Sequence, residues 1–214
     1  MKSRTFILDK IIRFIEKNPS FRRWEYIDNI YEVNSKDRMI DFIQQVLPKN
    51  CIGAEIGVFK GHLSPILLEN TKASKLHLID PWYFFKTHWN WAQGNQSTID
   101  ALRKILLDFK EEIENGRVKV HVGDDRQVLL TFPDQYFDWV YIDTTHQYEH
   151  TKQELQILAS KVKDDGIISG DDWRPDPNHH HHGVYKAVNE FIADGKYSII
   201  YSNDKNLQWA IKKV

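Results

Sequence analysis

The chain has 214 residues, of which 41% are hydrophobic and 28% are charged, so it can bury a sizeable core and does not have the composition of a disordered chain. Its 29 Lys and Arg residues balance 30 Asp and Glu residues, for a formal net charge of −1, which leaves no overall positive field to hold nucleic acid. Cys51 is the only cysteine, which excludes an internal disulfide and fits a reducing compartment.

The first predicted elements are helical. Residues 1–18 interleave apolar and charged side chains with helical periodicity, unlike the continuous apolar run of an export signal or a membrane span. We therefore expect a cytoplasmic protein. An irregular arm, Pro19–Asn34, precedes a second helix at Ser35–Leu47. We interpret residues 1–47 as a helical extension packed on a core domain, 48–214.

Strands and helices then alternate along the chain. Short apolar runs bounded by chain-breaking residues predict seven strands: Cys51–Ile56, Lys75–Ile79, Val118–Val122, Phe137–Ile142, Gly166–Ser169, Tyr197–Tyr201 and Leu207–Ile211. Helices are predicted near His62–Glu69, Thr98–Glu114, Arg126–Leu130, Tyr148–Val162 and Val184–Ala193. This order predicts an α/β fold with a doubly wound, Rossmann-like, mostly parallel seven-stranded sheet, to which a final hairpin adds an antiparallel edge strand.

The first strand runs into a turn with two glycines, Gly57 and Gly61, just before a helix that includes Ser64. Such a turn lets the backbone approach a ligand at a helix N-terminus. Glycine is also the ordinary residue of strand-to-helix turns, so this signal is weak alone.

The next two strands also end in polar residues, where ligands bind in open α/β sheets. Asp80, followed by Trp82, is placed to accept the hydroxyls of a ribose, although it could instead cap the next segment. Gly123, Asp124 and Asp125 form a second acidic tip that suits an adenine amino group. Together the three strand ends predict a nucleoside pocket.

These motifs, Glu55-Ile-Gly57-x-x-x-Gly61, Asp80 and Gly123-Asp124, resemble in order the cofactor motifs of class I S-adenosylmethionine-dependent methyltransferases. The resemblance covers roughly Cys51 to Val214. It implies that the glycine turn holds the methionine part of S-adenosylmethionine, Asp80 the ribose and Asp124 the adenine. The cofactor set that we predict is Glu55, Gly57, Gly61, Ser64, Asp80, Trp82, Gly123, Asp124 and Asp125.

The fourth and fifth predicted strands end in three acids, Asp143, Asp171 and Asp172. Neighbouring strand ends bring them together, and carboxylates at close range repel each other unless a proton or a cation intervenes. Oxygen ligands favour a hard ion such as Mg²⁺, with Ca²⁺ or Mn²⁺ as alternatives. A single Asp at a strand end is usually only a cap or turn residue.

The stretch Tyr141–Trp173 resembles the metal site of catechol O-methyltransferase and, more closely, the macrocin and mycinamicin sugar O-methyltransferases. That resemblance implies Asp143, Asp171 and Asp172 as metal ligands and His146 as a general base, unless His146 is only structural. It implies transfer of a methyl group to a hydroxyl of a small molecule, such as a sugar or glycoside; catechols stay open as acceptors. No nucleic-acid or membrane partner is expected, and a homo-oligomer stays open.

Other features favour competing hypotheses. Tyr148-x-x-x-Lys152 has the spacing of the catalytic pair of short-chain dehydrogenases, which makes an NAD(P)-dependent oxidoreductase the rival enzyme. Four successive histidines, His179–His182, permit a non-catalytic metal-binding module, although we interpret them as a solvated loop. The aromatic segment Trp82–Trp91 suits either a ligand wall or packing.

Overall fold

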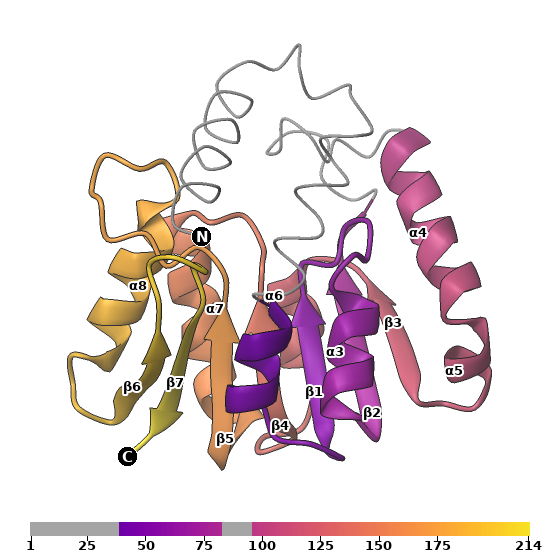
Figure 1. Ribbon diagram of the computed structural model, residues 1–214, viewed down its shortest axis with the longest axis horizontal. Coiled ribbons are helices and arrows are strands. Elements are labelled where there is room, and N and C mark those ends of the chain that lie inside the picture. Colours follow the sequence, from indigo (N-terminus) through magenta and orange to yellow (C-terminus); the bar gives the residue numbers. More distant parts are fainter. Residues whose placement is uncertain (1–38, 83–95) are drawn as a thin grey trace, which may run out of the picture. The chain divides into compact units, whose positions relative to one another are not determined.

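The structure is a computed structural model that describes residues 39–82 and 96–214 (Figure 1). The predicted first helix, the arm Pro19–Asn34 and the aromatic segment beyond Trp82 lie outside the described residues.

One seven-stranded sheet forms the centre of the described chain. In chain order its strands are β1 (Ile52–Ile56), β2 (Lys75–Asp80), β3 (Val118–Val122), β4 (Phe137–Ile142), β5 (Val162–Gly170), β6 (Tyr197–Ser202) and β7 (Trp209–Lys213). Their order in the sheet is β3-β2-β1-β4-β5-β7-β6. Strands β1 to β5 pair in parallel, whereas β7 pairs antiparallel with both β5 and β6. The predicted doubly wound sheet, with antiparallel pairing at one end, is therefore confirmed.

Helices flank the sheet on both faces (Figure 1). They are a helix at residues 39–46, α3 (Ser64–Thr71), α4 (Gln96–Asp108), α5 (Lys110–Glu114), α6 (Asp125–Leu130), α7 (Tyr148–Lys161) and α8 (His182–Ile192). Helix α7 contacts both α6 and α8, so these three make one layer. The helix at 39–46 and α3 lie in front of the sheet in the view of Figure 1, opposite that layer.

The core follows from the apolar strand runs that the sequence contains. Four of the five residues in β1 and five of the six in β4 are buried, as expected for parallel strands that are covered on both faces. Gly53 is needed in β1 because a Cβ there would lie 2.1 Å from the indole ring of Trp139. The buried indole of Trp139 fills the space that the glycine leaves.

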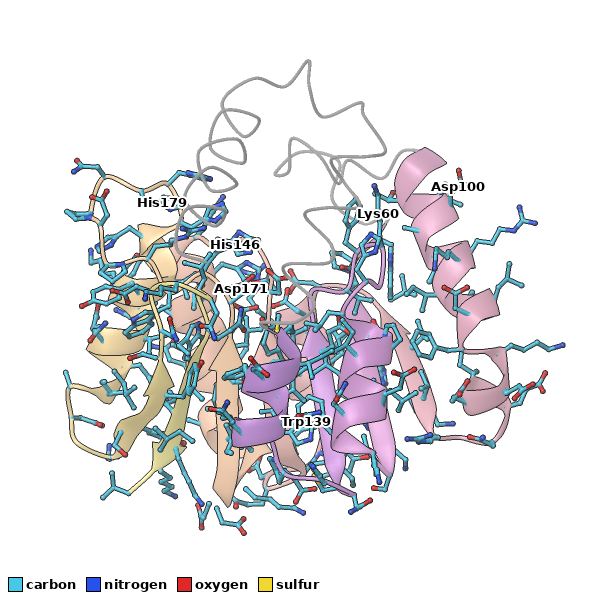
Figure 2. All side chains as sticks on the ribbon, in the orientation of Figure 1. Lys60, Asp100, Trp139, His146, Asp171 and His179 are labelled. Carbon is cyan, nitrogen blue, oxygen red and sulfur yellow. The ribbon has the colours of Figure 1, made fainter. Side chains whose placement is uncertain are left out.

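The strand order reverses between β1 and β4. Strands β2 and β3 follow on one side of β1, whereas the chain then returns to add β4 and β5 on its other side. Ligands of open α/β sheets bind at such a switch point, beyond the carboxyl ends of the strands. The turn after β1 and the acids after β4 and β5 therefore share one edge of the sheet. Figure 2 shows Lys60, His146 and Asp171 at this edge and Trp139 nearer the opposite one.

Several element boundaries differ from the prediction. The helix predicted at 98–114 is two helices, α4 and α5, which are interrupted at Phe109. β5 begins at Val162, directly after α7, and its pairing with β4 is irregular until Ile167. β7 begins two residues later than predicted, because a turn occupies residues up to Leu207, which has a φ of 64°.

Residues 42–47 of the predicted N-terminal extension belong to the core unit. Phe42 and Ile43 are fully buried, and the ring of Phe42 lies 5.1 Å from that of Tyr201 and 6.2 Å from that of Tyr141. The compact unit that contains the sheet accordingly begins at Phe42.

Candidate active site

The turn after β1 needs its two glycines. Gly57 has a φ of 88°, and a Cβ there would lie 2.0 Å from the backbone oxygen of Asp143 at the end of β4. Gly61 has a φ of 70°, and its amide donates to the backbone oxygen of Val58 at 2.8 Å. The turn is therefore pressed directly against the segment that carries the acids.

Two buried polar atoms beside this turn have no hydrogen-bond partner in the described chain, apart from the contact of the Ser64 hydroxyl with the Glu55 carboxyl. They are Oε2 of Glu55, which is 1% exposed, and Oγ of Ser64, which is fully buried at the start of α3. Burial raises the pKa of Glu55 well above its usual range; the Ser64 hydroxyl opposes this shift, and the charges of Asp143 and Asp80 add to it. Buried polar atoms are rarely left without partners, so this pair fits a polar ligand such as the amino and carboxyl groups of a methionine moiety.

Asp80 is engaged by backbone amides. Its Oδ2 accepts hydrogen bonds from the amides of Val58 at 2.9 Å and Phe59 at 2.8 Å, and its Oδ1 accepts from the amide of Trp82 at 2.6 Å. Burial raises the pKa of Asp80 despite these three donors. A ribose at Asp80 would have to use the remaining acceptor positions or displace the turn.

Trp82 is 1% exposed, and its indole Nε1 donates to the backbone oxygen of Phe59 at 2.8 Å. In this conformation its ring packs on the turn and presents no surface to a ligand.

The acidic tip after β3 is also partnered. Asp124 caps α6 and accepts from the guanidinium group of Arg126 at 3.0 and 2.6 Å. This hydrogen bonding lowers the pKa of Asp124. Asp125 points to α7, where both its carboxylate oxygens lie near Nε2 of His150. Gly123 continues the β2 pairing, with its amide donating to the backbone oxygen of Asp80 at 3.1 Å.

The three acids predicted as metal ligands are brought together. One carboxylate oxygen each from Asp143, Asp171 and Asp172 lies within 4.8 Å of the others. Burial, and then the charges of Asp143 and Asp172, raise the pKa of Asp171 well above its usual range. Carboxylates in such a cluster are suited to share a hard cation.

His146 lies between two of these acids. Its Nε2 is 2.9 Å from Oδ1 of Asp143, and its Nδ1 is 3.2 Å from Oδ2 of Asp172. Burial lowers the pKa of His146, but the bond to Asp143 and the surrounding negative charges outweigh burial and raise it to about 9. His146 and Asp172 both have positive φ, 58° and 61°, and such backbone strain concentrates at functional sites.

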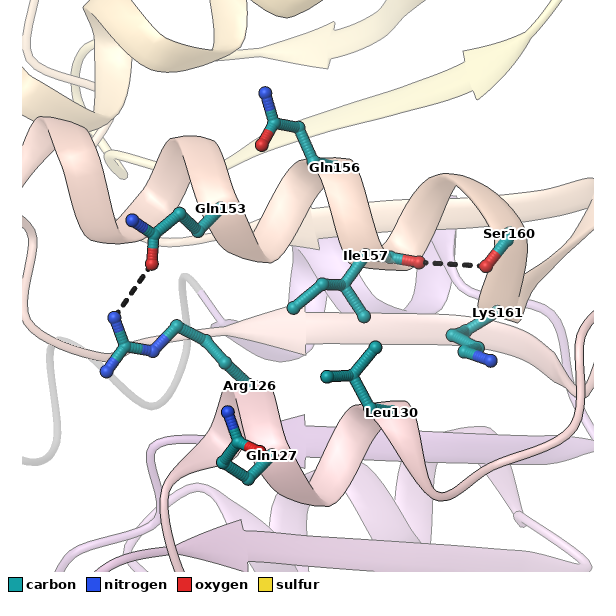
Figure 3. Close-up of a pocket in the computed structure, with 8 residues that line it drawn as sticks. All are labelled: Arg126, Gln127, Leu130, Gln153, Gln156, Ile157, Ser160 and Lys161. Atoms are coloured by element: carbon teal, nitrogen blue, oxygen red, sulfur yellow. Dashed lines mark hydrogen bonds between the residues drawn. The ribbon is translucent and has the colours of Figure 1, made fainter.

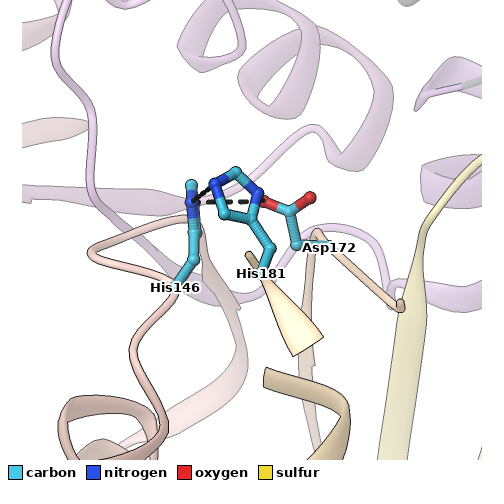
Figure 4. A group of neighbouring side chains, drawn as sticks. All are labelled: His146, Asp172 and His181. Atoms are coloured by element: carbon cyan, nitrogen blue, oxygen red, sulfur yellow. Dashed lines mark hydrogen bonds and ion pairs between the residues drawn. The ribbon is translucent and has the colours of Figure 1, made fainter. Parts of the chain in front are cut away.

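The histidine run is not simply a solvated loop, which corrects our interpretation. Nδ1 of His181 lies 2.8 Å from Oδ2 of Asp172, and its Nε2 lies 3.4 Å from Nδ1 of His146 (Figure 4). Burial raises the pKa of Asp172, but His181 and His146 overcome that effect and lower it to about 2. The interpretation failed because a contact across 35 residues leaves no local pattern in the sequence.

The sequence also gave no sign of the residues that hold Asp171 in place. Nε2 of Gln208 donates to Oδ1 of Asp171 at 2.8 Å, and Oε1 of Gln208 accepts from the hydroxyl of the buried Tyr141 at 2.5 Å. The indole Nε1 of Trp209 donates to the backbone oxygen of Asp171 at 2.9 Å. β7 therefore contributes to the acidic site although its own side chains are not acidic.

Tyr148 and Lys152 on α7 both bond to Glu190 on α8. Lys152 Nζ lies 3.2 Å from the hydroxyl of Tyr148 and 2.6 Å from Oε1 of Glu190, and the hydroxyl also bonds to Glu190. A separate groove of about 600 Å³ between α6 and α7 is lined by residues such as Arg126, Leu130 and Lys161 (Figure 3). None of the predicted site residues lines it.

Several solved structures with this architecture are named as methyltransferases, and the three described here carry provisional assignments. A protein of Staphylococcus aureus named as a caffeoyl-CoA O-methyltransferase has a TM-score of 0.61 at 14% identity, over 98% of this chain and 100% of its own. An S-adenosyl-L-methionine-dependent methyltransferase of Methanococcus maripaludis has a TM-score of 0.61 at 15% identity, over 88% and 90%. A methyltransferase of Streptococcus mutans, solved with SAH, has a TM-score of 0.54 at 14% identity, over 82% and 95%. The fold is that of class I S-adenosylmethionine-dependent methyltransferases.

A family model described as a methyltransferase domain matches residues 54–173, which is more than half of the chain and runs from β1 to Trp173 after the acids. The chain belongs to this family of S-adenosylmethionine-dependent methyltransferases, in place of the oxidoreductase alternative. Uncharacterized protein R132 of Acanthamoeba polyphaga mimivirus is 28% identical over 155 residues, which are 67% of this chain and 62% of that relative.

Within residues 39–82 and 96–214, no helix has both the length and the apolar character that crossing a membrane requires.

Proposed function

We propose that the protein transfers a methyl group from S-adenosylmethionine to a hydroxyl of a small molecule, such as a sugar or glycoside, with a divalent cation bound by Asp143, Asp171 and Asp172. The observation that carries this proposal is the position of the three carboxylates directly across the switch point from the turn at Gly57. A cofactor beside the turn and an acceptor beside the acids would then be neighbours.

The residues of the turn suit the cofactor. Oε2 of Glu55 can accept a hydrogen bond from the amino group of the methionine moiety, and the Ser64 hydroxyl, which lies at the Glu55 carboxyl, can turn to the carboxyl group. Asp80 and Asp124 would serve the ribose and the adenine if they exchanged some of their present partners, the backbone amides and Arg126. When bound, the cofactor supplies an electrophilic methyl group.

The acids and His146 suit activation of a hydroxyl. A neutral alcohol is a poor nucleophile, and a divalent cation at the acids would lower the pKa of a hydroxyl beside it. His146 is placed to take the proton of the hydroxyl at a ring nitrogen. A cation bound by the acids would offset their negative charge and so lower the pKa of His146, which leaves the imidazole neutral and able to act as the base. The protein otherwise contributes alignment of the two reactants.

Binding and methyl transfer test this proposal separately. Calorimetry should show binding of S-adenosylhomocysteine, and Glu55→Gln should weaken it at least roughly tenfold through loss of a charge-assisted hydrogen bond. Absence of binding at millimolar ligand would refute the cofactor site.

A screen of glycosides and catechols, with and without Mg²⁺, tests the metal and the acceptor. Asp171→Asn should abolish Mg²⁺-dependent transfer, whereas Asp165→Asn, an exposed acid on the same strand, should not. Transfer that persists in a chelator, or in Asp171→Asn, would refute metal dependence.

A further inference from the structure

A second cluster of charged side chains lies between α6 and α7 and shares no residue with the acidic site. It consists of Asp125, His150 and Glu154, and one ligand atom from each lies within 4.8 Å of the other two. Nε2 of His150 is 3.1 and 3.0 Å from the two carboxylate oxygens of Asp125 and 3.6 Å from Oε1 of Glu154.

This cluster is almost closed to solvent. The side chains of Asp125, His150 and Glu154 are 5%, 11% and 0% exposed. Burying two carboxylates side by side is costly unless something compensates their charge. Burial, followed by the charge of Asp125 and the close approach of the Asp125 carboxyl to that of Glu154, raises the pKa of Glu154 well above its usual range.

The surrounding protein leaves part of the cluster unsatisfied. The hydroxyl of Thr144 donates to Oε1 of Glu154 at 2.9 Å, but Oε2 of Glu154 has no hydrogen-bond partner in the described chain. The nearby guanidinium group of Arg126 donates to Asp124 and to Gln153 instead. A buried acceptor without a donor, beside a second acid and an imidazole, is an arrangement that a bound cation would satisfy.

We propose that Asp125, His150 and Glu154 bind a divalent cation of the borderline class, such as Zn²⁺. Two carboxylate oxygens and one imidazole nitrogen are ligands that Zn²⁺ accepts and that do not suit Mg²⁺, which prefers oxygen alone. Because Asp125 begins α6 and the other two ligands lie on the first turns of α7, the ion ties the two helices together. Its role is structural and does not depend on the proposed methyl transfer.

The competing account is a proton shared between Glu154 and Asp125 in place of the cation. Glu154→Gln separates the two accounts, because the amide keeps the shape and the hydrogen-bonding capacity of a protonated carboxyl and removes the negative charge. The matched control is Glu149→Gln, because Glu149 is exposed and lies on the same helix as Glu154.

Elemental analysis should measure the Zn²⁺ that the full chain retains after dialysis. The variants are compared with the wild type, because the histidine run and the acidic site also contain ligands for Zn²⁺. Glu154→Gln should retain one equivalent less than the wild type, or bind that equivalent at least roughly tenfold more weakly, whereas Glu149→Gln should retain the wild-type amount. Zn²⁺ should also raise the unfolding temperature of the wild type more than that of Glu154→Gln.

A second variant, His150→Asn, covers the case in which Glu154→Gln does not fold, and it should lose the same single equivalent. The additional variant His181→Ala should keep this equivalent, because His181 belongs to the other cluster. Equal Zn²⁺ content in the wild type and in either cluster variant would overturn the proposal and leave the shared proton as the explanation.

Discussion

His77 is a buried histidine on β2 that is held neutral. It is 4% exposed, and its ring nitrogens contact Nε2 of His121 at 2.8 Å and the hydroxyl of Tyr136 at 3.1 Å. Burial, followed by the charge of His121, lowers the pKa of His77 to about 3. Between this value and the usual histidine pKa of about 6.5, the unfolded chain binds a proton that the folded chain does not.

Acidification should therefore destabilise the protein through His77. The contribution of neutral His77 is complete above pH ~6.5 and is lost progressively toward pH 3, by about 2 kcal/mol at pH 5. His77→Gln should consequently show a smaller loss of unfolding free energy between pH 7 and pH 5 in urea titrations. Tyr136→Phe, which keeps the imidazole, should retain the wild-type dependence; an unchanged slope in His77→Gln would contradict the assignment.

Single residues also show where sequence reasoning reached its limit at the site. The sequence predicts that Asp143, Asp171 and Asp172 lie together because strand ends are visible as apolar runs followed by polar residues, whereas the role of His146 was implied only by the family resemblance. His181 and Gln208 were not predicted, because their roles depend on contacts between segments that the sequence does not place. No local pattern distinguishes a histidine that bonds to Asp172 from one that faces solvent.

At the scale of elements, the irregular pairing of β4 with β5 has a specific compensation. The register shifts between Phe137 and Trp139, and the side chain of Asp138 serves the neighbouring backbone. Its Oδ2 accepts from the amide of Ile52 at 2.8 Å, and its Oδ1 lies 2.6 Å from Nζ of Lys163. The carboxylate of Asp138 thus joins β1, β4 and β5 near the starts of these strands.

Asp138→Ala should lower the unfolding free energy by about 1–3 kcal/mol, because the Ile52 amide loses its acceptor. Asp138→Asn should cost less, since the amide oxygen still accepts. Lys163→Met should cost less than about 1 kcal/mol, because the Lys163 side chain is 38% exposed and exposed ion pairs contribute little. Equal losses in Asp138→Ala and Lys163→Met, measured by denaturant unfolding, would show that the ion pair matters instead.

The elements themselves were largely predictable, since buried parallel strands are continuous apolar runs and the intervening helices have clear periodicity. The exceptions have tertiary causes. β5 could be predicted only from Gly166, because the residues that follow its first residue, Lys163 to Asp165, are polar and lie where the pairing with β4 is irregular. The break between α4 and α5 at Phe109 likewise lies within a sequence pattern that predicts one continuous helix.

At the scale of the whole molecule, charge balance predicts which partners are absent. With 29 basic and 30 acidic residues, the protein should not bind structured RNA at micromolar concentration in 150 mM salt, because few counterions would be released. Fluorescence anisotropy with a labelled RNA hairpin at 50 and 150 mM salt measures this. Micromolar binding that weakens steeply with salt would indicate a nucleic-acid substrate instead of a small molecule.

The insertion of β7 between β5 and β6 has a consequence for biosynthesis. Within the described sheet, β6 pairs with β7 alone, and Trp209, the first residue of β7, and Gln208 just before it supply bonds that hold Asp171. During translation the parallel half of the sheet can form early, but β6 has no neighbour, and Asp171 lacks its bonds to Gln208 and Trp209, until β7 leaves the ribosome. Nascent chains therefore acquire a folded scaffold before they acquire an ordered acidic site.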